Sequence, residues 1–167
     1  MEIDPRISSA RVVILCGISG SGKTSFAHRL EPIGFERISA DLLIWEKYGD
    51  GFLTLPPEIK QKAFMEVMGE IETVLLARLE KGRRVVLDAT FCKRAKRDRI
   101  RQICREAGAH QCLVYFESSL PVLKSRLATR TGYGPDNQIV TPEQVEQYYR
   151  NFERPAADEI PVIITQE

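Results

Sequence analysis

The feature that most constrains this chain is a glycine-rich segment between an apolar run and a helical pattern. Residues 17–24 read Gly-Ile-Ser-Gly-Ser-Gly-Lys-Thr, which matches the pattern G-x-x-x-x-G-K-[ST] in full. The apolar run before it, residues 12–16, has the length of a buried strand. Glycines let successive backbone N–H groups face an anion, and the following helix adds a positive dipole end. A turn that used glycine only for packing would not require lysine followed by threonine.

The rest of the chain alternates strand-like and helical segments. Apolar runs predict strands over residues 11–16, 36–39, 84–88, 111–116 and 161–164. Start and stop signals predict helices over residues 23–30, 57–81, 93–107, 120–130 and 142–152. This alternation, with right-handed crossovers, predicts a three-layer α/β fold of the P-loop NTPase and kinase type. Its five-stranded, mainly parallel sheet would carry helices on both faces and bind ligands at the carboxyl ends of the strands.

Size and charge narrow the possibilities further. The chain has 167 residues, 43% of them hydrophobic, which fits one domain over residues 1–167 with a short lid at about residues 126–141. Because 24 basic residues oppose 23 acidic ones, no overall field favours nucleic acid or a membrane surface. The sequence has no signal peptide and no apolar run of membrane length, so we expect a cytoplasmic protein without a membrane partner.

The glycine-rich segment supplies the candidate residues for nucleotide binding. We expect Lys23 to bridge the β- and γ-phosphates of ATP and the Thr24 hydroxyl to bind Mg²⁺. Asp88 ends an apolar strand and is a second metal-side candidate, although an acid there could instead cap the next helix. No motif marks the adenine site, for which residues 151–155 are the candidate. The residues expected to contact ATP are Gly17, Ser19, Gly20, Ser21, Gly22, Lys23, Thr24 and Ser25.

Three further residues are candidates for the chemistry itself. Asp41 follows the second predicted strand, where a carboxylate can accept the proton of an attacking hydroxyl; it could equally be the N-cap of a short helix. Arg126 and Arg130 lie four residues apart, just before a glycine-bearing stretch. They could close over the phosphates, or they could be solvated charges that complement a helix dipole.

A basic helix and a group of aromatic residues bear on the acceptor. Four arginines of the predicted helix 93–107 fall on one flank: Arg94, Arg97, Arg101 and Arg105. That flank could contact a phosphodiester backbone, or it could be an ordinary solvated face. The aromatic residues after Asp41, of which Trp45 is the first, could stack on an acceptor base or pack in the core.

Taken in order, these segments resemble the P-loop kinases related to polynucleotide 5′-kinases and zeta toxins. The resemblance runs from residue 11 to about residue 159 and is carried by the glycine-rich loop, Ser39-Ala40-Asp41, Asp88-Ala89-Thr90 and the two later arginines. It implies that Thr24 binds Mg²⁺, that Asp41 contacts the acceptor hydroxyl as a base, and that Arg126 and Arg130 engage the phosphates.

The acceptor side of the resemblance is mixed. The strand end with Thr90 is similar to that of bacterial polynucleotide kinases, and Arg97 follows it at a similar distance. However, Ile44 stands where those kinases commonly have an arginine that grips the acceptor phosphate, and Phe91 stands where they often have asparagine. Trp45, Thr90, Arg94 and Arg97 are therefore the candidate acceptor contacts.

These observations predict an enzyme that moves the γ-phosphoryl group of ATP to an acceptor hydroxyl. The preferred acceptor is the 5′-hydroxyl end of a polynucleotide, so the expected partners are ATP, Mg²⁺ and nucleic acid ends. A small-molecule kinase of the zeta-toxin or antibiotic-phosphotransferase type is one alternative. A nucleotide-dependent ATPase switch, which needs no acceptor base, is the alternative from another class.

Overall fold

The computed structural model describes residues 2–132, 134–137 and 139–166, so residues 133 and 138 of the expected lid lie outside the described residues. Five strands form one sheet in the order β2-β3-β1-β4-β5, and every pairing between neighbours is parallel. The strands are β1 Val12–Cys16, β2 Phe35–Ser39, β3 Arg84–Asp88, β4 Gln111–Ser118 and β5 Val162–Gln166. The predicted α/β P-loop fold is confirmed.

Seven α-helices and three 3-10 turns are described between and beside the strands. The helices are α1 Pro5–Ser8, α2 Lys23–Leu30, α3 Ala40–Tyr48, α4 Pro57–Glu80, α5 Arg94–Glu106, α6 Leu120–Ala128 and α7 Pro142–Asn151. The 3-10 turns are η1 Glu31–Ile33, η2 Gly49–Thr54 and η3 Ala157–Glu159. Within the part of the chain described, none of these helices combines the length and apolarity needed to cross a membrane.

One helix prediction needs correction, and two short helices had no predicted bounds. The helix predicted to reach Arg130 ends at Ala128, so Arg130 belongs to the following loop. Helix α1 was not predicted, because its four residues are too short to show a period. Helix α3 was anticipated only as a short helix after Asp41 and was given no bounds, because the consecutive apolar residues 42–45 do not mark where it ends.

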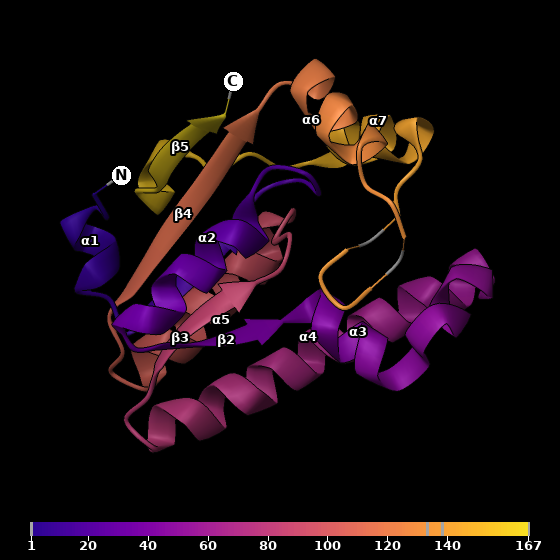
Figure 1. Ribbon diagram of the computed structural model, residues 1–167. Coiled ribbons are helices and arrows are strands. Elements are labelled where there is room, and N and C mark those ends of the chain that lie inside the picture. The colour runs from indigo at the N-terminus through magenta and orange to yellow at the C-terminus, as the bar shows by residue number, and fades with distance from the viewer. Residues whose placement is uncertain (1, 133, 138, 167) are drawn as a thin grey trace.

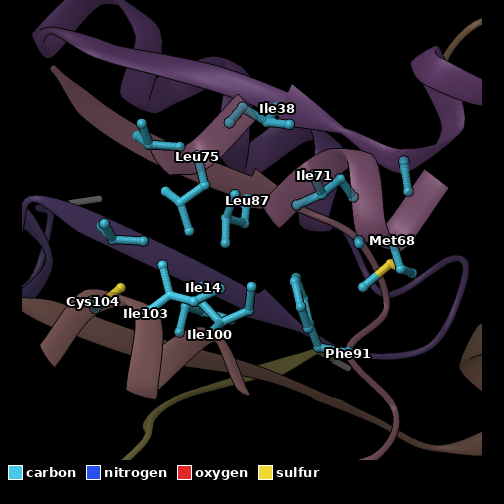
Figure 2. Close-up of a cluster of buried hydrophobic side chains, with 14 of the residues drawn as sticks. Ile14, Ile38, Met68, Ile71, Leu75, Leu87, Phe91, Ile100, Ile103 and Cys104 are labelled. Atoms are coloured by element: carbon cyan, nitrogen blue, oxygen red, sulfur yellow. The ribbon is translucent and has the colours of Figure 1, made fainter. Parts of the chain in front are cut away.

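The central strand β1 is buried along its whole length and divides the core into two layers. Val12, Ile14 and Cys16 face a cluster built with α4 and α5, part of which Figure 2 shows around Ile14 and Leu87. The alternate residues Val13 and Leu15 face the opposite cluster with α1 and α2. Because successive side chains of a strand point to opposite faces, a sheet covered on both sides requires this continuous apolar run.

The strand order brings three chain segments to one edge of the sheet. The register pairs Asp88, at the end of β3, with Leu15 of β1 on one side and with Ser39 of β2 on the other. The glycine-rich loop follows β1 and helix α3 follows β2, so both flank Asp88. In Figure 1 the loop between α6 and α7, drawn in orange, extends from this side of the molecule toward α3.

A buried ion pair anchors the segment that follows β3. The side chains of Arg97 on α5 and Glu159 in η3 are 0% and 1% exposed, and Arg97 Nε lies 2.8 Å from Glu159 Oε1. Arg97 Nη1 donates to the Phe91 carbonyl at 2.9 Å. Burial by itself would raise the pKa of Glu159, but hydrogen bonds from Arg97, the Ala156 N–H and Arg101 lower it to about 2. The pair therefore holds two ionised groups inside the fold.

We predict that Arg97→Gln lowers the free energy of unfolding by about 3 to 5 kcal/mol, because it leaves the Glu159 carboxylate buried without its main partner. Arg99→Gln on the same helix is the matched control, since the Arg99–Glu72 pair is largely exposed and its loss should change stability by less than about 1 kcal/mol. Urea denaturation of both variants measures the difference. Equal small losses would mean that the buried pair does not anchor the fold.

Candidate functional site

The glycine-rich loop adopts a backbone that only glycine allows at several positions. Gly20 and Gly22 have φ angles of 90° and 96°, and Gly22 is the N-cap of α2. A Cβ atom on Gly17 would lie 2.7 Å from Ser21 Oγ and 3.1 Å from the Phe116 carbonyl, so a side chain does not fit. The Gly17 N–H donates to the Thr90 carbonyl at 3.1 Å, which ties the loop to the segment after β3.

Lys23 is the first residue of α2 and lies inside the loop. Its side chain is buried, and Nζ donates to the Ile18 carbonyl at 3.1 Å across the loop. Burial lowers the pKa of Lys23, while the negative charges of Asp88 and Asp41 act in the opposite direction. An ammonium group in such a desolvated position favours an anionic ligand, because the negative charge of the ligand stabilises the ammonium where water cannot.

A cavity of about 290 Å³ opens beside this lysine at the carboxyl edge of the sheet. It is lined by residues from the loop and α2, from the first turn of α3, from the end of β3 and the segment after it, from α4, and from the segment after α6. These are Ser19, Gly20, Gly22, Lys23, Thr24, Ser25, His28, Ala40, Asp41, Phe64, Asp88, Ala89, Thr90, Arg130 and Asp136. Most of the predicted nucleotide-side residues therefore share a cavity with the predicted base and with Thr90.

Asp41 lies in the first turn of α3 and is not its N-cap. The cap is Ser39, whose hydroxyl accepts a hydrogen bond from the Leu42 N–H at 3.2 Å, so the capping alternative for Asp41 is excluded. Burial and the nearby Asp88 carboxylate raise the pKa of Asp41 to about 6, against the opposing charges of Lys23 and Arg130. The Asp41 carboxylate is therefore ionised at neutral pH, yet it binds a proton much more readily than an ordinary aspartate.

Asp88 and Thr24 face the same cavity as possible metal-side groups. The Asp88 side chain is 4% exposed, and its Oδ2 accepts a hydrogen bond from Arg37 Nε at 3.0 Å. In the described residues no group of three or more His, Cys, Asp or Glu side chains could hold a metal ion. Mg²⁺ usually binds through one or two protein oxygens together with substrate phosphates. The carboxylate of Asp88 and the hydroxyl of Thr24 fit that donor set.

The structure separates the two arginines that the sequence placed on one helical face. Arg130 lines the cavity with Asp41; burial lowers its pKa, which the Asp41 charge partly offsets. Arg126 points to the other side of the glycine-rich loop, where it donates to Gln166 Oε1 at 2.9 Å and to the Gly20 carbonyl at 3.4 Å. The two side chains diverge because α6 ends between them.

Arg126 belongs to a second cavity, which adjoins the first along the loop. Its lining comes from the glycine-rich loop, α2, β4, α6, the residue Arg130 after α6, and β5: Gly20, Gly22, Ser25, Phe26, Arg29, Phe116, Arg126, Arg130, Ile164 and Gln166. None of the residues 151–155, which the sequence suggested for the adenine ring, lines it. Phe152 and Arg154 instead line a small pocket behind the loop, with Ile18 and Tyr115.

The basic flank of α5 is not the open phosphate-binding surface that the sequence suggested. Arg97 is fully buried and paired with Glu159, so it cannot reach an acceptor. Arg94 makes a two-point contact with Asp158, and Arg101 binds both Glu159 and Asp98. Of the predicted acceptor contacts, only Thr90 lines the cavity; Trp45 does not.

Sequence reasoning missed three residues at the cavity or beneath it: Arg37, His28 and Asp136. The sequence feature that could have drawn attention to Arg37 is its position inside the short strand β2, directly before two buried residues. Asp136 follows Gly134-Pro135, a turn-forming pair within the expected lid. Arg37 and Asp136 were overlooked because nothing in the sequence indicates that their side chains meet.

The fold and this site define a P-loop protein. The chain belongs to the AAA_33 family, described as an AAA domain, which matches residues 12–155. No curated protein sequence matches it.

Solved structures with the same fold include a gluconokinase, a sugar kinase and a chain of an RNA repair complex. A gluconokinase from Sinorhizobium meliloti 1021 is 22% identical with a TM-score of 0.66, and the match covers 92% of this chain and 81% of that one. A sugar kinase from Janibacter sp. HTCC2649 is 20% identical with a TM-score of 0.66, covering 94% and 84%. A chain of the Pnkp1/Rnl/Hen1 RNA repair complex is 20% identical with a TM-score of 0.66, covering 84% of this chain but 43% of that one.

We predict that Asp41→Asn raises the melting temperature of the ligand-free protein at pH 8. The pKa of Asp41 lies near 6 in the folded protein and near 3.8 in its ordinary state, so the ionised carboxylate destabilises the fold. This penalty is complete above about pH 6 and disappears below about pH 4. For a chain of this size, each kcal/mol of destabilisation that the substitution removes should raise the melting temperature by roughly 2 to 4 °C.

Thermal melts at pH 8 and pH 4 measure the effect, with the exposed Asp50→Asn as control. The gain of Asp41→Asn should shrink toward zero at pH 4. An equal gain at both pH values would contradict the assigned environment of Asp41.

Proposed function

We propose that this protein transfers the γ-phosphoryl group of ATP to a hydroxyl of a small acceptor molecule. The observation that carries the proposal is the single cavity shared by Lys23, Thr24 and Asp41. A phosphate-binding loop alone would serve an ATPase switch equally well. A carboxylate with a pKa raised to about 6, in the same cavity as that loop, is suited to accept the proton of an attacking hydroxyl.

Each side chain has a role that follows from its position. The loop N–H groups and Lys23 hold the phosphates, and Arg130 balances charge that spreads over the transferring group. Asp41 orients the acceptor hydroxyl and takes its proton as the new O–P bond forms, while the bond to the β-phosphate oxygen breaks and leaves ADP. Bound Mg²⁺, held by Thr24 and Asp88 with the phosphates, would neutralise phosphate charge.

The second cavity is the proposed place of the nucleotide base. It shares part of its lining with the first cavity but does not include Asp41, and Arg126, Arg29 and Gln166 give it polar and cationic edges beside the rings of Phe26 and Phe116. An aromatic base can stack on a guanidinium or pack against apolar side chains. This arrangement replaces residues 151–155 as the proposed adenine site.

Two observations favour a small acceptor over a polynucleotide end. Ile44, which stands where polynucleotide kinases commonly have a phosphate-binding arginine, is 1% exposed and packs in the core cluster. Three of the four flank arginines of α5, Arg94, Arg97 and Arg101, are paired with Asp98, Asp158 or Glu159 and are not free to track a phosphodiester backbone. The matches to the gluconokinase and the sugar kinase, which cover more than four fifths of each chain, also support a small acceptor.

An acceptor panel tests the proposal. The protein is incubated with γ-labelled ATP, Mg²⁺ and either sugar acids, neutral sugars, amino sugars, nucleosides or 5′-hydroxyl oligonucleotides. We expect label to reach a small hydroxyl compound at a rate that changes little with salt. Transfer only to oligonucleotides, with a steep loss as salt rises, would establish the polynucleotide alternative. Release of inorganic phosphate with every compound, and no transfer, would favour the ATPase switch.

We predict that Asp41→Asn lowers the transfer rate by about 100- to 10,000-fold while nucleotide affinity stays within a few-fold of wild type. Single-turnover transfer and nucleotide titration measure the two quantities, with Asp50→Asn again as control. In the wild type, kcat/KM should fall as pH drops below about 6, because protonated Asp41 cannot accept a proton. Unchanged transfer by Asp41→Asn would rule out Asp41 as the base.

A further inference from the structure

The segment after α6 forms a small hairpin that presents one carboxylate to the sheet. Gly134 and Asn137 exchange backbone hydrogen bonds of 3.3 and 3.2 Å. The Asn137 side-chain amide donates to the carbonyls of Thr131 and Gly132, which closes the base of the turn. Asp136 lies at the tip. We call this segment, as described at residues 131–132 and 134–137, the lid hairpin.

Asp136 joins the lid hairpin to two elements distant in the sequence. Its Oδ1 accepts a hydrogen bond from Arg37 Nη2 on β2, and its Oδ2 lies 3.2 Å from His28 Nε2 on α2. The hydrogen bonds to Arg37 and His28 lower the pKa of Asp136 despite its partial burial. These contacts are the polar attachment of the hairpin tip to the rim of the cavity.

Arg37 connects this attachment to the metal-side carboxylate. Its side chain is 8% exposed, and the same guanidinium that binds Asp136 through Nη2 binds Asp88 Oδ2 through Nε at 3.0 Å. A guanidinium presents its N–H groups in a rigid planar fork, so the direction of one hydrogen bond restricts the direction of the others. The position of Asp136 therefore restricts how Arg37 can meet Asp88.

We propose that Asp136 and Arg37 are positioning residues through which docking of the lid hairpin orients Asp88 toward the cavity. With the hairpin docked, Arg37 meets Asp88 through one nitrogen and one oxygen. Without Asp136, the best remaining partner for Nη2 is the second oxygen of Asp88, in the two-point pairing that arginine and carboxylate favour. That pairing would withdraw Asp88 from a cation in the cavity. The inference rests on the proposed role of Asp88 beside Mg²⁺ and ATP.

Ligand-free hydrogen exchange tests the attachment itself. Backbone amide exchange of residues 134, 136 and 137 should accelerate at least about tenfold in Asp136→Asn and in Arg37→Gln, because either change removes the ion pair that docks the hairpin. Arg37→Lys keeps the positive charge but loses the planar guanidinium. It replaces Arg37→Gln in the experiment if that variant folds poorly. Asp98→Asn is the matched control, since it removes an exposed aspartate paired with arginines on α5. Wild-type exchange rates in both Arg37 variants would overturn the proposal.

The Mg²⁺ dependence of nucleotide binding tests the effect on Asp88. The readout is the rise in melting temperature with a non-hydrolysable ATP analogue, titrated with Mg²⁺, which needs no acceptor and no turnover. Asp136→Asn and each Arg37 variant should raise the half-saturating Mg²⁺ concentration by about 3- to 10-fold, as loss of an outer-shell partner does. Asp98→Asn should leave that concentration unchanged.

The double variant decides whether the two residues act together. In an Arg37→Lys background, Asp136→Asn should add less than twofold to the half-saturating Mg²⁺ concentration, because its effect passes through Arg37. Independent, multiplying effects would overturn the proposal, as would an unchanged Mg²⁺ requirement in Asp136→Asn despite a faster-exchanging hairpin. A wild-type protein that binds no nucleotide with Mg²⁺ would refute the proposed function instead, while the exchange experiment would still decide the attachment.

Discussion

The parallel arrangement of β2, β3 and β1 fixes where the chemistry of this protein can occur. In a parallel sheet the carboxyl ends of neighbouring strands lie at one edge, and here the register sets Asp88 between the ends of β1 and β2. The glycine-rich loop leaves β1 at this edge, and α3 starts from β2 with Asp41 in its first turn. The site is therefore a consequence of strand order, because three segments far apart in the sequence become neighbours only through the sheet.

The same arrangement concentrates charge in a poorly solvated place. Burial lowers the pKa of Lys23 and raises that of Asp41, and the two groups with Asp88 and Arg130 influence one another across the cavity. Without ligand, Lys23 binds a carbonyl of its own loop. Such an arrangement favours function over stability, since desolvated charges weaken the fold but bind an incoming phosphate or proton strongly. Arg37 extends this network to the lid hairpin, so an element outside the sheet also acts on it.

The sequence predicted the nucleotide side of the site far better than the acceptor side. The loop motif, the buried strand before it and the alternation of elements each depend on local patterns, and these patterns identified the fold and the neighbours of Lys23. The expected role of Arg97 as an acceptor contact required instead that its side chain have no acidic partner within the protein. Glu159 lies 62 residues further along the chain, and only the folded structure brings it to Arg97. A helical flank of arginines looks the same in a sequence whether it is solvated or neutralised.

The pair Arg126 and Arg130 illustrates a second limit. Residues four apart on a continuous helix lie on one face, but α6 ends at Ala128. Arg130 lines both cavities, whereas Arg126 lines the second cavity and not the first. Helix ends depend on capping contacts that a short pattern does not determine. Arg37 and Asp136 are 99 residues apart, and nothing local to either position indicates that they meet, although they join two parts of the site.

A crystal structure of the protein with Mg²⁺ and a non-hydrolysable ATP analogue tests the central claim most directly. The account predicts that the γ-phosphate lies against Lys23 with the Asp41 carboxylate facing it across space for an acceptor hydroxyl, and that the base lies in the cavity beside Arg126. A γ-phosphate directed away from Asp41, or an analogue bound outside the glycine-rich loop, would contradict it.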